Sequence, residues 1–330
     1  MKIYTFGVEM WMNEWENNCE FNLAETCVES LTLTELLNIT GRNETDLSAL
    51  LPLKMTYGDI KGSDRLRNAI AALYHRQKNT NILVTHGTIG ANMLVHKTLV
   101  EPDDKVISIV PTYQQHYSIP KSIGANISLL HLSEKTDWLP DLRELEKLAQ
   151  PNTKLIALTN PNNPTGALIP KEMLEEIVSI AREVGAWVLC DEVYRGTDQH
   201  GNGMTPAMAD IYDKGISTAG MSKAYSLAGL RLGWIAAPEE FIEDVMIHRD
   251  YDTISVGMLD DHFATIALEG YEKILKRAHD ITRGNLAQLA FWMENETKLS
   301  WIKPKSGTTA LVKYDLKMNS YDFCINLIKE

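Results

Sequence analysis

The sequence predicts an α/β protein with a mostly parallel, doubly wound sheet and a smaller α+β unit after it. Short β-rich apolar segments alternate with longer helical patterns through the middle of the chain. Several of these segments are apolar without alternation, which is typical of strands covered by helices on both faces. With 330 residues, 44% of them hydrophobic, the chain is long enough for one large domain and a smaller one. Ligands of such sheets bind at the carboxyl ends of the strands.

The individual elements can be located from composition and boundary residues. Pro170 opens one helix at its first turn and Gly185 closes it, and Ser63 or Asp64 caps another. The segments with strand composition are Ile82–Thr85, Lys105–Val110, Ile127–Leu132, Lys154–Thr159, Ala186–Cys190, Gly215–Thr218 and Leu232–Ala236.

Three regions divide the chain. We expect residues 1–35 to form an N-terminal arm that is part of the small domain, and residues 36–250 to form the large domain. Residues 251–330 turn helical, contain a short strand at Thr309–Lys313 and form the small domain. The last segment, Ser320–Glu330, begins an amphipathic helix without a stop signal, so we expect this domain to be incomplete at its C-terminus.

Charge and cysteine usage narrow the class of protein. The net charge of −12 argues against a nucleic-acid or anionic-membrane partner. The four cysteines form no CxxC pair, no signal-peptide core is present near the start, and no apolar run approaches the ~20 residues that span a bilayer. We therefore expect a cytoplasmic protein. The sequence has no HExxH, GxGxxG or GxxxxGK[ST] motif, so it predicts no metal, nicotinamide or ATP site.

Lys223 is the residue with the strongest chemical context. It lies in Gly220–Lys223, and upstream of it are the turn Asn160–Gly166 and the segment Asp191–Tyr194. A single lysine is usually a solvated surface charge. A lysine that follows these two segments predicts Schiff-base chemistry. Because a buried carboxylate needs a partner, we expect Asp191 to keep a ring nitrogen protonated.

Two further strand ends carry polar or aromatic residues. The small residues of Thr85–Ala91 let backbone N–H groups and the Thr88 hydroxyl approach an anion at a helix N-terminus, although an ordinary tight turn has the same composition. Tyr113 follows the next strand, where an aromatic ring serves either a ligand or simple packing. The two prolines within Asn160–Gly166 make that turn rigid and fix Asn163 as a donor.

In this order and spacing, these residues resemble the cofactor site of fold-type-I pyridoxal-phosphate enzymes, specifically class I and II aminotransferases. The resemblance runs from about Tyr57 to Arg231 and continues weakly to Gly307. It implies pyridoxal 5'-phosphate as the cofactor and the following roles. Lys223 forms the Schiff base and moves protons, and Asp191, supported by His116, pairs with the pyridine nitrogen. Asn163 and Tyr194 bind the phenolic oxygen, and Tyr113 stacks on the ring. The phosphate is bound by Arg231, Ser222 and the amides of Thr88 and Ile89.

The same resemblance implies a homodimer, because Tyr57 matches a tyrosine that reaches the phosphate of the neighbouring subunit. A plain turn before a helix is the alternative for Tyr57. Two features depart from the family pattern. Gly220 stands where a Ser or Thr is frequent, and no late arginine for the substrate carboxylate is present. Arg42, Arg195 and Arg249 are available for that role, but we expect each to be a solvated surface residue.

The sequence therefore predicts an aminotransferase of amino acid metabolism or biosynthesis, which moves an amino group between an amino acid and a 2-oxo acid. The alternatives of the same fold are a carbon–sulfur β-lyase, a decarboxylase and a cyclising synthase, because the first half-reaction is common to several of them. A non-catalytic cofactor-binding regulator is a further alternative. The sequence does not separate these reactions or identify the amino acid.

Overall fold

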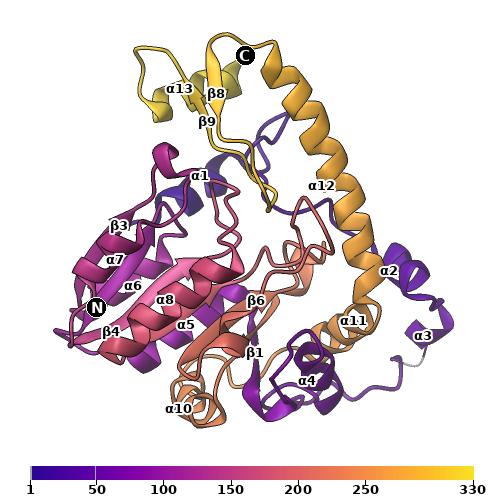
Figure 1. Ribbon diagram of the computed structural model, residues 1–330. Helices are drawn as coiled ribbons and strands as arrows, with labels where there is room; N and C mark the ends of the chain where they lie inside the picture. The colour runs from indigo at the N-terminus through magenta and orange to yellow at the C-terminus, as the bar shows by residue number, and fades with distance from the viewer. Residues whose placement is uncertain (1, 49) are drawn as a thin grey trace.

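The computed structural model describes residues 2–48 and 50–330, and its centre is a seven-stranded sheet (Figure 1). The strands are β1 (Ile82–His86), β2 (Lys105–Val110), β3 (Asn126–His131), β4 (Thr153–Thr159), β5 (Trp187–Asp191), β6 (Gly215–Gly220) and β7 (Leu232–Ala236). They lie in the order β1-β7-β6-β5-β4-β2-β3. In this sheet β7 runs opposite to the other six strands, so the prediction of a mostly parallel sheet is confirmed.

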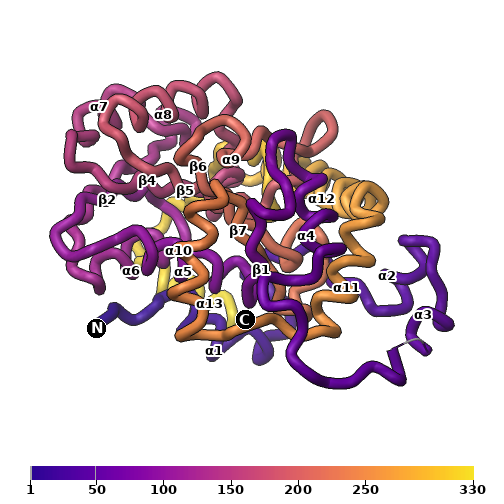
Figure 2. Tube along the Cα trace, turned by 90° about the horizontal axis from the view of Figure 1, so that it is seen from below, coloured from indigo at the N-terminus to yellow at the C-terminus, as the bar shows by residue number. Residues whose placement is uncertain are grey.

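Helices cover both faces of this sheet because consecutive strand residues point to opposite sides. In β5, Val188 packs into a core with Ile177 of α8 (Lys171–Val184), whereas Leu189 packs into a second core with Leu94 of α5 (Gly87–Leu99). The second core also contains residues of α10 (Glu239–Arg249), and Figure 2 shows α5 and α10 next to each other. The remaining helices of this region are α4 (Asp64–Ala71), α6 (Gln115–Ile123), α7 (Leu142–Leu148) and α9 (Met208–Ile211), with 3-10 turns at Asn79–Asn81, Glu134–Thr136 and Ala228–Leu230.

The boundary residues act largely as expected. Ser63 caps α4, because its side chain accepts a hydrogen bond from the Leu66 N–H. Gly185 ends α8 in the left-handed conformation at φ +73°. Pro170 differs slightly from the prediction: it is the N-cap of α8, and the helix begins at Lys171.

The two ends of the chain pack against each other and against the sheet. The early helices are α1 (Gly7–Trp15), α2 (Leu33–Thr40) and α3 (Thr45–Ser48), and the late ones are α11 (Met258–Glu269), α12 (Tyr271–Glu294) and α13 (Ser320–Lys329). Leu36 of α2 belongs to the same core as Ile266 of α11 and Ile274 of α12. In Figure 1 the long helix α12 leads from α11 to α13 and to a hairpin of β8 (Leu299–Trp301) and β9 (Val312–Tyr314). Among the described residues, no helix combines the length and the apolar character needed to cross a membrane.

Candidate active site

The sequence-predicted residues converge on one edge of the sheet. Thr159 at the end of β4 pairs with Asp191 at the end of β5, and Asp191 pairs with Thr218 of β6. The Asn160–Gly166 turn, Asp191 and the Lys223 segment therefore begin side by side. Because β7 runs the other way, its first residue, Leu232, lies opposite His86 at this same edge. This pairing brings Arg231 to the start of α5.

Asp191 is buried and held by three groups. Its Oδ2 atom accepts a hydrogen bond of 2.8 Å from Asn92 Nδ2 and lies 3.5 Å from His116 Nε2. Its Oδ1 atom accepts from the Val193 N–H at 3.1 Å. These contacts fix the carboxylate without a lysine or arginine partner among the described residues, which suits an acid that faces a cationic ring nitrogen.

Asn92 is a functional residue that the sequence reasoning missed. Its Oδ1 atom accepts from Thr218 Oγ1 at 2.7 Å, so its amide orientation is fixed and its Nδ2 donors face Asp191. The signal was present in the sequence. Thr88, Asn92 and His96 follow one another at four-residue spacing and therefore form a polar row on one side of the helix. His96 Nε2 lies 3.4 Å from His116 Nδ1, and burial holds the pKa of His96 well below its ordinary value.

Asn163 and Tyr194 meet as the resemblance implied. The Nδ2 atom of Asn163 donates to the Tyr194 hydroxyl at 3.1 Å. Burial raises the pKa of Tyr194, the positive charge of Lys223 offsets part of this effect, and the charge of Asp191 adds to it. Lys223 and Asp191 thus act on the same phenol and share one site, instead of lying at opposite ends of the molecule.

The Lys223 amine is partly buried and faces the N-terminal arm. Its Nζ atom donates to Thr26 Oγ1 at 2.6 Å and contacts Cys27 Sγ at 3.3 Å. Burial lowers the pKa of Lys223, but Tyr194, Cys27 and Glu25 outweigh burial, and the net direction is upward. No sequence pattern pointed to Thr26 or Cys27.

Beside the lysine, the start of α5 forms a cradle for an anion. The amides of Thr88 and Ile89 lie in the first turn, where backbone N–H groups have no intrahelical partner. Thr88 Oγ1 is buried and, within residues 2–48 and 50–330, without a hydrogen-bond partner. Gly87 has φ +65°, and a Cβ there would lie 3.0 Å from Arg231 Nη2, so the guanidinium sits directly over the turn. Ser222 is half-buried in the adjoining loop.

The geometry explains why Gly220 replaces the frequent Ser or Thr. A Cβ at Gly220 would lie 2.6 Å from Thr88 Oγ1 and 2.9 Å from the Leu232 carbonyl oxygen. The Thr88 hydroxyl therefore occupies the space that a side chain at position 220 would need. The hydroxyl of Thr88 in α5 therefore replaces the hydroxyl that a Ser or Thr at position 220 in β6 would provide.

Tyr113 lies at the end of β2, next to the arm. Its hydroxyl donates to Glu9 Oε1 at 2.5 Å, and its ring packs on Phe6 with a centroid distance of 4.7 Å. Burial, together with Glu9, raises the pKa of Tyr113. The arm contact with Glu9 was not predicted, because 104 residues separate the two side chains along the chain.

The other sequence-predicted residues lie apart from this cluster. Tyr57 is 74% exposed and contacts none of the site residues by a hydrogen bond in the described part of the chain. Arg42 is a surface residue, as expected, and pairs with Glu269 at 2.7 Å. The surface prediction is wrong for Arg195 and Arg249, which are 9% and 1% exposed.

These groups fit pyridoxal phosphate. The cradle of Thr88 and Arg231 suits its phosphate, Asp191 suits its pyridine nitrogen, and Asn163 and Tyr194 suit its phenolic oxygen, with Lys223 beside them. A doubly wound sheet that gathers this set at its carboxyl edge defines the fold-type-I class of pyridoxal-phosphate enzymes.

The comparisons with known proteins identify the family. The chain belongs to the aminotransferase class I and II family, which it matches over residues 50–330. It is 32% identical over 292 residues to the glutamate-pyruvate aminotransferase AlaA of Escherichia coli, covering 82% of this chain and 70% of that protein. It is 26% identical over 326 residues to capreomycidine synthase of Streptomyces vinaceus, covering 97% of this chain and 82% of that protein.

Solved structures agree with this assignment. A pyridoxal-phosphate-dependent aminotransferase from Streptococcus suis superposes with a TM-score of 0.96 at 44% identity, covering 100% of this chain and 88% of that chain. The pyridoxal-phosphate-dependent cyclase OrfR shares the fold at a TM-score of 0.90 and 23% identity. The predicted enzyme class and cofactor are therefore confirmed: the chain is a pyridoxal-phosphate-dependent aminotransferase.

Proposed function

We propose that this enzyme transfers an amino group between a small amino acid and a 2-oxo acid, with Lys223 as the residue that bonds the cofactor. The hydrogen bond between Asn163 and Tyr194 carries the proposal, because it lies beside Lys223 and on the same phenol that Asp191 influences. When bound, pyridoxal phosphate supplies an aldehyde that condenses with amines and a ring that withdraws electrons from the substrate Cα.

The protein contributes proton transfer and orientation. Lys223 Nζ, once free, is the base that removes the proton from the substrate Cα and later returns a proton. Its hydrogen bond to Thr26 and its contact with Cys27 hold the amine on the side of the arm. Asp191 keeps the pyridine nitrogen cationic, and Asn92 keeps the Asp191 carboxylate in one orientation.

Other residues position the cofactor. Arg231, Thr88 and the α5 amides would hold the phosphate, with Ser222 and Ile89 beside them, and Tyr113 would pack on the ring. An anion at a helix N-terminus gains from both free N–H groups and the helix dipole.

Mass spectrometry after borohydride reduction tests the assignment of Lys223. We expect the cofactor mass on the peptide that contains Lys223, and no covalent label on the Lys223→Ala variant. Lys214→Ala is the control and should label fully, because Lys214 is a half-buried lysine before β6 whose Nζ atom donates to the Gly185 carbonyl oxygen. A label on another lysine of the wild-type chain would refute the assignment.

We further propose that the enzyme is a homodimer in which Tyr57 completes the partner's site. Large apolar side chains that precede Tyr57 in the sequence are strongly exposed in the single chain, with Leu51 at 86% and Met55 at 74%. Mixing Tyr57→Ala chains with Lys223→Ala chains tests this, because each mixed dimer would contain one intact site. We expect about a quarter of the wild-type activity from an equal mixture, and no gain over the separate variants if each chain works alone.

A cyclising synthase is the second candidate for the reaction. The observation in its favour is the match to capreomycidine synthase, which spans more of this chain than the match to AlaA. Incubation with an amino acid and an acceptor oxo acid separates the candidates. Formation of a new amino acid and of pyridoxamine phosphate supports transamination. A cyclic product without consumption of the oxo acid supports a synthase, and pyruvate with ammonia would indicate a lyase.

A cytoplasmic location completes the proposal. Its support is the acidic composition and the four cysteines, which are free in the structure. Fractionation of the producing cells with an antibody against the chain would test it. Recovery in a secreted or membrane fraction would contradict it.

A further inference from the structure

A cavity of about 440 Å³ lies apart from the catalytic residues, between the turn after α4, the loop before α9 and the start of α12. None of the residues assigned to the cofactor lines it. Its volume falls within the ~300–1,000 Å³ range of small-molecule sites. One wall is apolar and aromatic, with Leu73, Met204, Pro206, Ile211 and Tyr271.

Basic residues also line this cavity. His75, Arg76, Lys171 and Arg195 line the cavity, against Asp210 as its one acidic residue. Both Asp210 carboxylate oxygens are already used, because Oδ2 accepts from the His75 N–H and Oδ1 accepts from the Arg76 N–H, each at 2.9 Å. An excess of positive charge remains along this lining, because Arg76, Lys171 and Arg195 are cations at neutral pH, although Lys171 also pairs with Glu175 at 3.7 Å. It favours an anionic occupant.

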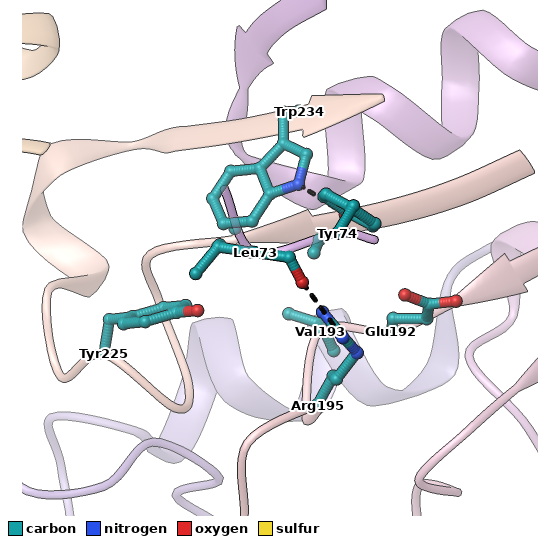
Figure 3. A pocket seen from close by; sticks show the side chains of 9 residues that line it. Leu73, Tyr74, Glu192, Val193, Arg195, Tyr225 and Trp234 are labelled. Carbon is teal, nitrogen blue, oxygen red and sulfur yellow. Dashed lines mark hydrogen bonds between the residues drawn. The ribbon is translucent and has the colours of Figure 1, made fainter. Parts of the chain in front are cut away.

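Arg195 is the deepest of these cations. It is 9% exposed and donates only to carbonyl oxygens, from Nε to Thr205 at 2.8 Å and from Nη2 to Leu73 at 3.1 Å. Figure 3 shows the bond to the Leu73 carbonyl oxygen, with Glu192 near the guanidinium but not bonded to it. Arg195 also lines the neighbouring cavity drawn there, which has a volume of about 10 Å³. Across the described residues, no carboxylate forms a salt bridge with the Arg195 guanidinium. The charges of Glu192 and Asp198 act on it through space, and its Cζ atom lies 5.3 Å from the centre of the Tyr74 ring. A directly paired anion would add a charge-assisted hydrogen bond that these groups do not form.

Thr205 provides an independent sign of a ligand. Its side chain is 7% exposed and lines the large cavity. In the part of the chain that the structure describes, its Oγ1 atom has no hydrogen-bond partner. A buried hydroxyl without a partner loses the hydrogen bonds that it would make in water.

We propose that this cavity is a second ligand site that binds a small organic dianion, a phosphate ester or a dicarboxylate. Arg76 and Arg195 are the guanidinium donors for its charged group, and Thr205 adds a hydroxyl. The apolar wall with Leu73 and Tyr271 takes the organic part. The site is separate from the cofactor cradle at Thr88 and Arg231.

Isothermal titration calorimetry on the enzyme saturated with pyridoxal phosphate tests the proposal, because the saturated cradle then takes no further anion. The probes are ribose 5-phosphate, malate and inorganic phosphate. We expect saturable binding of ribose 5-phosphate or malate at one per chain. Arg76→Gln should weaken it at least about tenfold, and Thr205→Val about fivefold. Arg143→Gln, an exposed arginine of α7, is the control and should bind as the wild type does.

The outcomes separate cleanly. Tighter binding of ribose 5-phosphate identifies the phosphate ester, and tighter binding of malate identifies the dicarboxylate. Absence of saturable binding of all three probes up to about 10 mM would overturn the proposal. So would equal affinity of the wild type and Arg76→Gln, or binding of inorganic phosphate alone. Because a dicarboxylate can also enter the catalytic site, binding of malate supports the proposal only where Arg76→Gln weakens it, and this comparison does not depend on which reaction the catalytic site performs.

Discussion

Replacing Gly220 tests whether the Thr88 hydroxyl has taken over the space of a family hydroxyl. A Cβ at this position would lie 2.6 Å from Thr88 Oγ1, 2.9 Å from the Leu232 carbonyl oxygen and 3.1 Å from Gly233 Cα. Two of the three atoms belong to the backbone of β7, next to β6 in the sheet, so they cannot rotate away. Thr88 can move only by leaving its buried place at the start of α5.

We expect Gly220→Ala to lower the free energy of unfolding by about 3 kcal/mol, the upper part of the range for overpacked cores. Gly220→Ser should lower it at least as much, although it restores a residue type that is frequent in the family. Displacement of Thr88 also removes a donor from the cradle, so the dissociation constant of pyridoxal phosphate should rise about tenfold.

Urea unfolding of the cofactor-free protein gives the first quantity, and titration of pyridoxal phosphate followed by absorbance gives the second. Gly229→Ala is the matched control, because no atom of the described residues would lie within 4 Å of a Cβ at that position. It should change the free energy of unfolding by less than about 0.5 kcal/mol. If Gly220→Ser kept the wild-type unfolding midpoint and bound the cofactor more tightly, the reasoning about Thr88 would be refuted.

Three further predictions concern buried or open positions elsewhere. Burial raises the pKa of Glu192 from 4.5 to about 7, so the folded chain keeps a proton that the unfolded chain loses, and its stability falls as pH rises between these values. In urea unfolding at several pH values, the free energy of unfolding of Glu192→Gln should therefore rise relative to that of the wild type by up to about 3 kcal/mol between pH 4.5 and 7. A difference that is independent of pH would contradict this reasoning. Arg249 is buried, and its guanidinium nitrogens have no hydrogen-bond partner among the described residues. Arg249→Met should therefore raise the free energy of unfolding by about 1–3 kcal/mol. A loss of stability would instead reveal a partner that the single chain lacks. A Cβ at Gly284 in α12 would meet no atom within 4 Å in residues 2–48 and 50–330, so Gly284→Ala should stabilise the fold by about 0.5–1 kcal/mol. Thermal unfolding measures this change, and an unchanged midpoint would argue against it.

The central sheet was predictable because its strands are continuous apolar runs between turn residues. Lys105–Val110 and Leu232–Ala236 match the observed strands at both ends. The strand β8 was missed because a segment of three residues, Leu299–Trp301, carries no readable period. The prediction for Arg249 failed for a different reason. Charge suggested a surface residue, yet Phe241, Val245 and Arg249 recur every four residues on the buried face of α10.

The part of the site that follows strand ends was predictable, and the part supplied by the arm was not. Asn163, Asp191 and Lys223 each come shortly after an apolar run, so a parallel sheet must bring them to one edge. Thr26 reaches Lys223 across 197 residues of sequence, and only the three-dimensional path of the arm creates that contact. No local pattern carries information about a pairing of this kind.

The segment after β5 ties the cofactor site to the structure behind it. Asp191 and Tyr194 face the site, whereas Glu192 and Arg195 are anchored on the other side. Glu192 Oε1 accepts from Ser217 Oγ and from the Met208 N–H, each at 2.7 Å. Because the two sets of residues alternate within one short turn, the anchored side chains of Glu192 and Arg195 help to position the Tyr194 hydroxyl, together with Asn163. A change at Arg195 should therefore reach Tyr194 through the backbone, without any contact between the two ligand sites.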